Sequence, residues 1–527
     1  MARRLPFLAV LAGYLLIALW FWDSHLVPGD STSRVANAYY TLYSRDPHLA
    51  AIGFVWNPLP SLVLLPFLPL RHVFPALTQE SLLPVLASAV FMAAVVWLVH
   101  DVLRRASVPP VPRALLTGAF ALHPMIVVYA GNGMSEACFL LCLLLAVRHL
   151  QEWLTTARVT PLVPLGLAVG LAYGARYEAL APAAAVPVLV FLVTWWRTRS
   201  VATARVDAVI VAFPAALAVA VWALASRLIV GQWFATFSSE YGNSAQVSAN
   251  SSGISSVTGT DLASRALYGG QQLLGLSPFV AVLLVAALIL AWRRRSPGVL
   301  APVTVLGSVL AFDALAFLSG TSFGWLRFHI AVIPLAVLLA GHCLSGQPAG
   351  AAATGATAGA PAHGASRWRA AAVRVRRHAA PLALAAAAIP AALVTLGTPE
   401  LAREESEWFT ASGAARTAAL ADVNATVAAD LDRLALPDGA VVTDAAYAFG
   451  VILASDNPRQ FVITPDRDFP ATLAAPRESG ARYLLISARG AADAVRRSTF
   501  GDAPVTAPGA RSWHDPSGTV QWTLVPL

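Results

Sequence analysis

Ionisable side chains stand at the edges of several long apolar segments of this chain. Asp30 lies in "PGDSTSR", directly after an apolar run that begins at Leu5. Comparable positions later in the chain carry Glu136, Arg176, Glu178, Arg327 and His329. Charged groups at membrane depth are costly and commonly mark functional sites. A carboxylate can act as a general base, and an arginine can hold a phosphate group through two parallel hydrogen bonds.

Each of these residues also has a simpler structural interpretation. Asp30 can cap the helix that the following residues predict, and Glu136 can be a first-turn acid favoured by the helix dipole. Arg176 and Glu178 can form a local ion pair, and Arg327 can be an anchor whose charged end reaches the membrane surface. Because all of these positions fall at the same predicted membrane depth, we predict that they line one cavity that opens to one side of the membrane.

The composition is that of a polytopic membrane protein. Of the 527 residues, 57% are hydrophobic and only 12% are charged, whereas soluble domains carry roughly 25% charged residues. Mean hydropathy is +0.64. A transmembrane helix needs roughly 20 apolar residues, and the apolar runs predict about eleven such helices. Their expected ranges are 5–22, 81–103, 114–130, 135–150, 162–175, 179–196, 208–228, 272–292, 299–319, 328–345 and 379–397.

Arginine placement predicts the orientation in the membrane. All clusters of arginine fall on the same side of the predicted spans. They lie at 3–4, 104–113, 148–158, 197–205, 293–295 and 367–377. Cytoplasmic loops of membrane proteins are rich in arginine, so we expect a cytoplasmic N-terminus. All 36 basic residues are arginine, which together with the alanine-rich composition is typical of a GC-rich bacterial genome, so we expect a bacterial plasma-membrane protein. The residues around Asp30 and the C-terminal region are then extracytoplasmic. This distribution accounts for the net charge of +8 and excludes a nucleic-acid partner.

Composition also divides the chain into regions. Residues 1–345 form the predicted transmembrane catalytic region, 346–378 a cytoplasmic linker rich in Gly, Ala and Arg, and 379–397 the last transmembrane helix. Residues 398–527 predict an extracytoplasmic α/β domain. Its expected elements are strands at 439–444, 460–466 and 481–487 and an amphipathic helix at 415–435. The fold class is therefore mainly α, with a C-terminal α/β domain.

Two short segments carry separate expectations. The stretch 58–70 is apolar, rich in proline and too short for an ordinary span, so we expect a re-entrant or interfacial element. The polar stretch 237–261 predicts an outer loop that could close over the site.

Several short motifs resemble one family of membrane enzymes. "PGDSTSR" after the first span, "NGMSEACFLLCLLLAV", "GARYEALAP" and "WLRFHIAVIPLAVLLA" occur in this order within residues 1–345. They resemble the GT-C glycosyltransferases, especially relatives of the protein O-mannosyltransferases and aminoarabinose transferases. The resemblance implies a first outer loop that bears a catalytic acid, a cavity that faces outward and a polyprenyl-phosphate-linked sugar as donor.

The first outer loop departs from the family in one respect. Many members carry two nearby acids there, whereas this chain has Asp30 and then Asp46 sixteen residues later. A divalent metal prefers several oxygen ligands. The sequence therefore leaves metal dependence open, and we expect a reaction without a cofactor.

These residues suggest an inverting sugar transfer in which Asp30 is the general base. The residues expected to bind the donor phosphate are Arg327, Arg176 and His329. The residues expected to contact the sugar or the acceptor are Glu136, Glu178, Tyr39, Tyr40 and Trp56. The two glutamates could instead orient the arginines, and the aromatic residues could instead anchor the chain at the membrane interface. The extracytoplasmic acceptor would be a cell-envelope glycan, a lipid or a protein.

Other classes of protein remain compatible with the sequence. A transporter, or a flippase for lipid-linked sugars, would place ionisable residues within its spans, and Asp313 lies within a predicted span. A membrane-anchored scaffold would use the outer α/β domain to bind a partner. Most ionisable residues gather at one membrane boundary rather than in the middle of the spans, which favours the enzyme.

Overall fold

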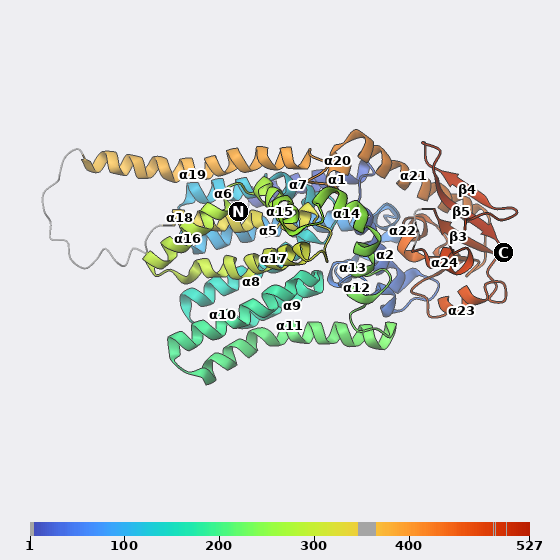
Figure 1. Cartoon of the computed structure of the whole chain (residues 1–527), viewed down its shortest axis with the longest axis horizontal. Helices are drawn as coiled ribbons and strands as arrows, with labels where there is room; N and C mark the ends of the chain where they lie inside the picture. Colours follow the sequence, from blue (N-terminus) through green and yellow to red (C-terminus); the bar gives the residue numbers. More distant parts are fainter. Residues whose placement is uncertain (1–4, 346–364, 489, 491, 502) are drawn as a thin grey trace.

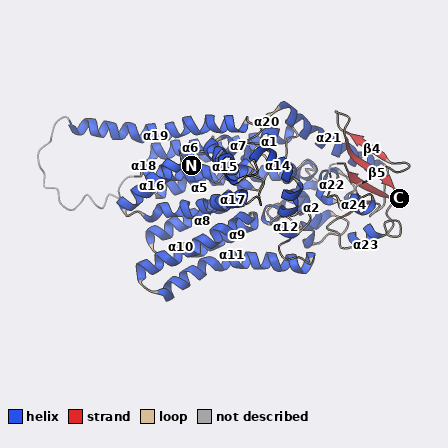
Figure 2. Ribbon diagram, viewed as in Figure 1, coloured by secondary structure: helices blue, strands red, loops and turns tan. Residues whose placement is uncertain are grey.

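The chain folds into a long helical bundle that carries a small α/β domain at one end (Figures 1 and 2). The computed structural model describes residues 5–345, 365–488, 490, 492–501 and 503–527. The predicted fold class is confirmed in its main features. The chain is mainly helical, several helices are apolar enough to cross a membrane, and a C-terminal sheet follows them.

Seven of the described helices are long and apolar enough to span a membrane, and two bent helix pairs raise this number to as many as nine. The single helices are α1 (Leu5–Asp23), α5 (Leu82–Arg105), α8 (Glu136–Thr156), α10 (Leu180–Thr198), α11 (Val201–Val230), α17 (Leu300–Leu318) and α18 (Val332–Leu344). The bent pairs are α6 (Pro110–Ala121) with α7 (Pro124–Gly131), at 58°, and α15 (Leu262–Leu276) with α16 (Val280–Arg294), at 74°. Apolar segments of this kind fold as helices because a helix satisfies its own backbone polar groups in a bilayer.

Two further predicted spans correspond to shorter apolar segments. These are α9 (Leu162–Ala175) and the Leu382–Leu396 part of α19 (Ala365–Leu396). Every predicted range thus coincides with a helix or a bent pair, but the count of eleven membrane spans stays a prediction. Residues 346–364 of the predicted linker lie outside the described residues. Residues 365–378 form the first part of α19, because alanine and arginine favour helix.

The segment after α1 forms a helix, α2 (Gly29–Tyr43), between the bundle and the α/β domain (Figure 1). Its buried face packs against α5 and against α22 (Ala445–Ala454) of the domain. Ser31 Oγ donates a hydrogen bond to the carbonyl of Asn132 at 2.7 Å. This contact ties the first turn of α2 to the end of the bundle.

The proline-rich stretch 58–70 contains short helices. After the 3-10 helix η1 (Leu49–Ile52), the chain forms α3 (Leu59–Leu62), the 3-10 helix η2 (Leu65–His72) and α4 (Ala76–Gln79). Proline lacks a backbone donor and interrupts longer helices. Leu62, Phe67 and Leu70 of this stretch are exposed, which is compatible with the expected interfacial element.

The polar stretch 237–261 is helical rather than the expected loop. It contains the end of α12 (Ala235–Ser238), α13 (Asn243–Ala249) and α14 (Ser251–Thr258). Helices this short form because tertiary packing stabilises them. Tyr241 Oη donates to Asp444 Oδ2 at 2.5 Å, and Arg497 forms an ion pair with Glu240. Both contacts hold the segment against the C-terminal domain.

The C-terminal domain contains a five-stranded sheet with the order β2-β1-β3-β5-β4. β1 (Val441–Thr443), β2 (Phe461–Ile463) and β3 (Tyr483–Ser487) are parallel, whereas β5 (Val520–Pro526) runs antiparallel to β3 and to β4 (Arg511–His514). The remaining helices are α20 (Ser406–Phe409), α21 (Ala411–Arg433), α23 (Phe469–Ala474) and α24 (Ala494–Thr499). The three predicted strands and the predicted helix at 415–435 are confirmed, whereas β4 and β5 were not predicted.

Candidate active site

Asp30 lies in the first turn of α2 and faces an arginine that is distant in the chain. Pro28 is the N-cap residue of α2, and no side chain of the described residues caps the helix. The Asp30 carboxylate instead accepts a hydrogen bond from Arg327 Nη1 at 3.0 Å. The Asp30 side chain is 32% exposed, whereas the Arg327 side chain is 4% exposed. Asp30 is therefore not a helix cap. Its partly exposed carboxylate forms an ion pair with a buried arginine.

Arg327 connects three segments of the chain. It lies in the 3-10 helix η5 (Leu326–His329), directly before α18. Its Nε atom is 3.1 Å from Glu404 Oε2 and 3.9 Å from Glu136 Oε1. Its guanidinium lies 4.3 Å from the ring centre of Trp325. These contacts fix the guanidinium with one edge directed toward α2.

Arg176 is enclosed by two carboxylates. Its Nη1 atom forms an ion pair with Glu136, and its Nε atom donates to Glu178 Oε1 at 2.9 Å. The side chains of Glu136 and Glu178 are only 1% and 3% exposed. Asp313 of α17 is buried and interacts electrostatically with Glu178 and Arg176. The two glutamates therefore orient the arginine, which is one of the two roles that the sequence suggested for them.

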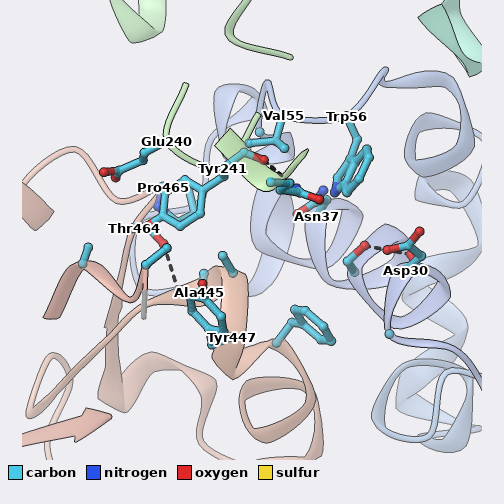
Figure 3. Close-up of a pocket in the computed structure, with 18 of the residues that line it drawn as sticks. Asp30, Asn37, Val55, Trp56, Glu240, Tyr241, Ala445, Tyr447, Thr464 and Pro465 are labelled. Atoms are coloured by element: carbon cyan, nitrogen blue, oxygen red, sulfur yellow. Dashed lines mark hydrogen bonds between the residues drawn. The ribbon is translucent and has the colours of Figure 1, made fainter. Parts of the chain in front are cut away.

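A cavity of about 1030 Å³ separates the end of the bundle from the C-terminal domain. Figure 3 shows Asp30 and Trp56 on one side of this cavity and Tyr447 and Thr464 on the opposite side. Tyr40 also contributes to the lining. Asp30, the predicted base, thus has direct access to a large open space.

Six of the nine predicted site residues do not line this cavity: Arg327, Arg176, Glu136, Glu178, Tyr39 and His329. Tyr39 is fully buried in the layer between α2 and the C-terminal domain, and the guanidinium of Arg71 covers its ring at 5.0 Å. His329 is buried at the end of η5, and its Nδ1 atom has no hydrogen-bond partner among the described residues. Neither side chain lines the cavity next to Asp30.

Arg34 belongs to the site although it is absent from the predicted set. It lies one turn after Asp30 on α2, is 6% exposed, and stacks 4.9 Å from the ring centre of Trp56. Within the described part of the chain, its Nε and Nη1 atoms have no hydrogen-bond partner. Arg34, Asp30 and Arg327 line a smaller pocket of about 40 Å³. The spacing signalled this position, because residues four apart lie on the same face of a helix.

Glu404 and Glu405 complete the cluster and carry no comparable sequence signal. Both residues lie between α19 and α20, in "LAREESEW". Glu404 lines the main cavity, and Glu405 Oε1 accepts a hydrogen bond from Tyr129 at 2.8 Å. Nothing in the local sequence places these acids beside Asp30, because the contact depends on how α19 returns to the end of the bundle.

The carboxyl groups of Asp30 and Glu404 differ in proton affinity. Burial alone would raise the pKa of Asp30, but the charges of Arg327 and Arg34 outweigh burial and hold this pKa below its usual value. Burial raises the pKa of Glu404 well above its usual value, Arg327 offsets this only in part, and Glu405 adds to the rise. At neutral pH Asp30 is therefore ionised, and Glu404 keeps its proton to a higher pH than an ordinary glutamate does. Burial lowers the pKa of Arg34 to about 10, so its guanidinium stays charged.

The described residues around Asp30 include no cluster of side chains that could bind a metal ion. Among them, no three or more histidine, cysteine, aspartate or glutamate side chains are arranged to hold a metal ion. Asp46, the second acid after α1, accepts a hydrogen bond from the backbone nitrogen of Arg467 at 3.1 Å. Asp46 thus takes part in the contact with the C-terminal domain. Whether the reaction depends on a metal ion therefore stays an open question, as it was from the sequence.

Comparison of the chain with protein-family models finds no match, and comparison with curated protein sequences finds none either. The function therefore has to follow from the geometry and chemistry of the site.

Proposed function

We propose that the protein is an inverting glycosyltransferase that moves a sugar from a polyprenyl-phosphate donor to a hydroxyl group of an extracytoplasmic acceptor. One observation carries this proposal. An ionised aspartate, held by Arg327, faces a large cavity at the end of an apolar bundle. One turn away lies Arg34, whose Nε and Nη1 atoms have no hydrogen-bond partner among the described residues. This combination offers a base and an anion site at the place where a membrane-bound donor would arrive.

In the proposed reaction, Asp30 accepts the proton of the acceptor hydroxyl. The acceptor oxygen forms a bond to the anomeric carbon while the bond from that carbon to the phosphate oxygen breaks. The electron pair of the broken bond leaves with polyprenyl phosphate, and the configuration at carbon inverts. General-base assistance of this kind contributes roughly 10²–10⁴ in rate. The low pKa of Asp30 keeps the carboxylate deprotonated at neutral pH, which a general base requires.

Arg34 is the best candidate to bind the donor phosphate. A buried guanidinium with free donors gains much from a phosphate, because an unsatisfied buried donor is costly and charge-assisted hydrogen bonds are strong. Arg327 can share the phosphate, since it already lies between Asp30 and Glu404. Arg176 is committed to Glu136 and Glu178. We therefore assign Arg176 to positioning rather than to direct contact with the donor.

The distribution of arginines along the bundle supports the same proposal. Helices α8 and α10 begin beside the site, at Glu136 and just after Glu178. At their far ends arginines gather, where Arg197 donates to the carbonyl of Leu154 in a short hydrogen bond. Arginine marks the cytoplasmic side, so the site would face the outside of a bacterial plasma membrane. Sugar donors that carry a lipid tail can reach a site at that surface.

A transporter of lipid-linked sugars is the second candidate, and the bent helices favour it. Broken spans often line the path of a transported substrate. The breaks in α6–α7 and α15–α16 contact each other, because His123 Nε2 lies 3.1 Å from the carbonyl oxygen of Leu276. Asp313 weakens this candidate, since it lies with Arg176 rather than near this contact.

The test is donor consumption by purified protein in nanodiscs. Short-chain polyprenyl-phosphate mannose and polyprenyl-phosphate arabinose are supplied separately, and release of polyprenyl phosphate is followed. We expect the wild type to consume one donor and Asp30→Asn to consume neither, at equal melting temperature. Equal donor consumption by both proteins would show that Asp30 is not the base. Glu404 would then be the next candidate for that role. Binding of donor without consumption by either protein would favour the transporter.

A further inference from the structure

The main cavity has a second wall, and the C-terminal domain supplies it. Residues that follow the carboxyl ends of β1, β2 and β3 line this wall: Ala445, Ala446, Thr464, Pro465, Ala492 and Ala494. In open α/β sheets, ligands bind in the crevice outside the carboxyl ends of parallel strands. The sheet therefore turns its usual binding edge toward Asp30.

Hydrogen bonds hold this wall in one conformation. Asp444, directly after β1, accepts hydrogen bonds from Tyr241 Oη at 2.5 Å and from the backbone nitrogen of Ala494 at 2.8 Å. It also caps α22 through the backbone nitrogen of Ala446 at 2.9 Å. One buried carboxylate thus joins the end of β1 to the start of α24 and to the segment after α12. A wall fixed in this way suits binding, because little ordering cost remains.

Aromatic rings and uncharged polar groups both line the cavity. The rings belong to Tyr40, Trp56, Tyr241, Trp408, Tyr447, Phe449 and Phe469. The uncharged polar groups belong to Asn37, Gln246, Asn250, Thr417 and Thr464. A sugar ring offers an apolar face of C–H groups and a rim of hydroxyls, so it matches flat rings flanked by amides and hydroxyls.

The charges of the lining do not favour a polyanion. The lining carries four acidic residues, Asp30, Glu240, Glu404 and Glu407, and one basic residue, Arg416. Arg327 and Arg497 form ion pairs with Asp30 and Glu240. A polymer of phosphates or carboxylates would therefore find few basic partners in this lining and would lie beside acidic groups. A neutral ligand meets no such penalty. The cavity volume of about 1030 Å³ lies at the upper end of the roughly 300–1,000 Å³ of small-ligand sites.

We propose that the cavity face of the C-terminal domain binds a neutral oligosaccharide and presents one of its hydroxyls to Asp30. The acceptor would then be a glycan, rather than an anionic polymer or a protein side chain. The transfer step rests on the function proposed above, whereas the binding of the oligosaccharide does not.

The test is binding to the full-length protein in nanodiscs, without donor, by titration calorimetry. The probes are short linear mannan and arabinan fragments, a glycerol-phosphate oligomer and a serine-rich peptide. We expect a neutral fragment to bind and the phosphate oligomer and the peptide not to bind. Tyr447→Ala and Phe449→Leu should each weaken binding by about threefold to tenfold, the usual range for one aromatic contact. Phe409→Ala is the control, because Phe409 neighbours Trp408 but is 49% exposed and outside the lining.

The outcomes separate this inference from the proposed function. Absence of binding by both neutral fragments, or equal binding by wild type, Tyr447→Ala and Phe449→Leu, overturns the inference. Preferential binding of the peptide or the phosphate oligomer also overturns it. Donor consumption is then measured on the same preparations. Donor consumption without glycan binding would support the transferase and reject the glycan site. Glycan binding without donor consumption would support the glycan site and reject the transferase.

Discussion

Two carboxylates of this chain lie among arginines, and their surroundings differ. Asp101, near the end of α5, accepts hydrogen bonds from the Nε atoms of Arg104, Arg105 and Arg148 at 3.1, 2.7 and 3.0 Å. Its side chain is 8% exposed. Both oxygens of this carboxylate are therefore occupied, and the residue joins α5 to α8.

Asp30 has the opposite arrangement. It accepts a side-chain hydrogen bond from Arg327 and is 32% exposed toward the cavity. A carboxylate has about four lone-pair sites, so Asp30 retains sites that can accept a proton from a ligand. Both residues lie next to arginine. They differ in that Asp30 keeps carboxylate lone pairs accessible from the cavity, and this accessibility is what a reactive group needs and a structural one lacks.

The largest expected effect comes from exchanging each acid for its amide. Asp30→Asn should lower the transfer rate by roughly 10²–10⁴, because the amide cannot act as a base. Asp101→Asn should leave the rate of the folded protein unchanged and lower the melting temperature, because three arginines lose their common charge partner. The measurements are the transfer rate at saturating donor and the melting temperature of both variants. A similar loss of rate in both variants would contradict the assignment of Asp30 as the reactive carboxylate and Asp101 as the structural one.

The next effect concerns arginine. Arg34→Gln should weaken donor binding by about tenfold to a hundredfold, the effect of losing charged hydrogen bonds, while the melting temperature stays the same or rises. The rise is possible because the variant removes a buried guanidinium whose Nε and Nη1 have no partner within the described part of the chain. Arg148→Gln is the matched control and should leave donor binding unchanged. The measurement is the dissociation constant for polyprenyl phosphate. Unchanged binding in Arg34→Gln would assign the phosphate to Arg327.

A smaller, pH-dependent effect is expected at Glu404. Burial raises the pKa of this carboxyl, so below that raised pKa the group is neutral and glutamine replaces it with little change. As pH rises through that pKa, the wild type gains a negative charge near the phosphate site and donor affinity falls. Glu404→Gln lacks this fall. Profiles of kcat/KM against pH should therefore coincide below the raised pKa of Glu404 and separate above it. A variant that is inactive at every pH would instead make Glu404 the base.

Much of the fold follows from local sequence. Long runs of alanine, leucine and valine predict spanning helices because the bilayer allows few alternatives. β1, β2 and β3 were predictable because short, continuously apolar runs mark buried parallel strands. β4 was not, since three of its four residues are exposed and its pairing with β5 depends on tertiary structure.

The residues of the candidate site also fall into those that local sequence predicts and those that depend on tertiary structure. Asp30 could be predicted because its position after an apolar run is a local feature. Tyr39 could not be separated from Tyr40 in the sequence, yet only Tyr40 lines the cavity. Adjacent helical residues point in directions about 100° apart, and the packing of α22 decides which direction faces the cavity. The contact of Glu404 with Arg327 is also long-range, so no local pattern predicts it.

The smallest expected effect concerns a third acid beside an arginine, Asp466, which lies 3.3 Å from Arg45 of the first outer segment. Burial raises the pKa of Asp466 to about 6, and Arg45 offsets this only in part. The folded state therefore binds the proton more tightly than the unfolded state. Stability is greatest below the unfolded pKa and falls as pH rises through about 6, by no more than roughly 3 kcal/mol.

Asp466→Asn tests this relation, because asparagine keeps an oxygen acceptor for the backbone nitrogen of Ile463 and removes the titration. Thermal unfolding is compared at pH 4.5 and pH 7. The wild type should lose more stability over this interval than Asp466→Asn. The control is Asp438→Asn, since Asp438 is exposed and pairs with the exposed Arg459; its pH dependence should match the wild type. Parallel curves for all three proteins would mean that Arg45 holds Asp466 ionised, and this pair would then resemble the saturated carboxylate of Asp101 rather than the open one of Asp30.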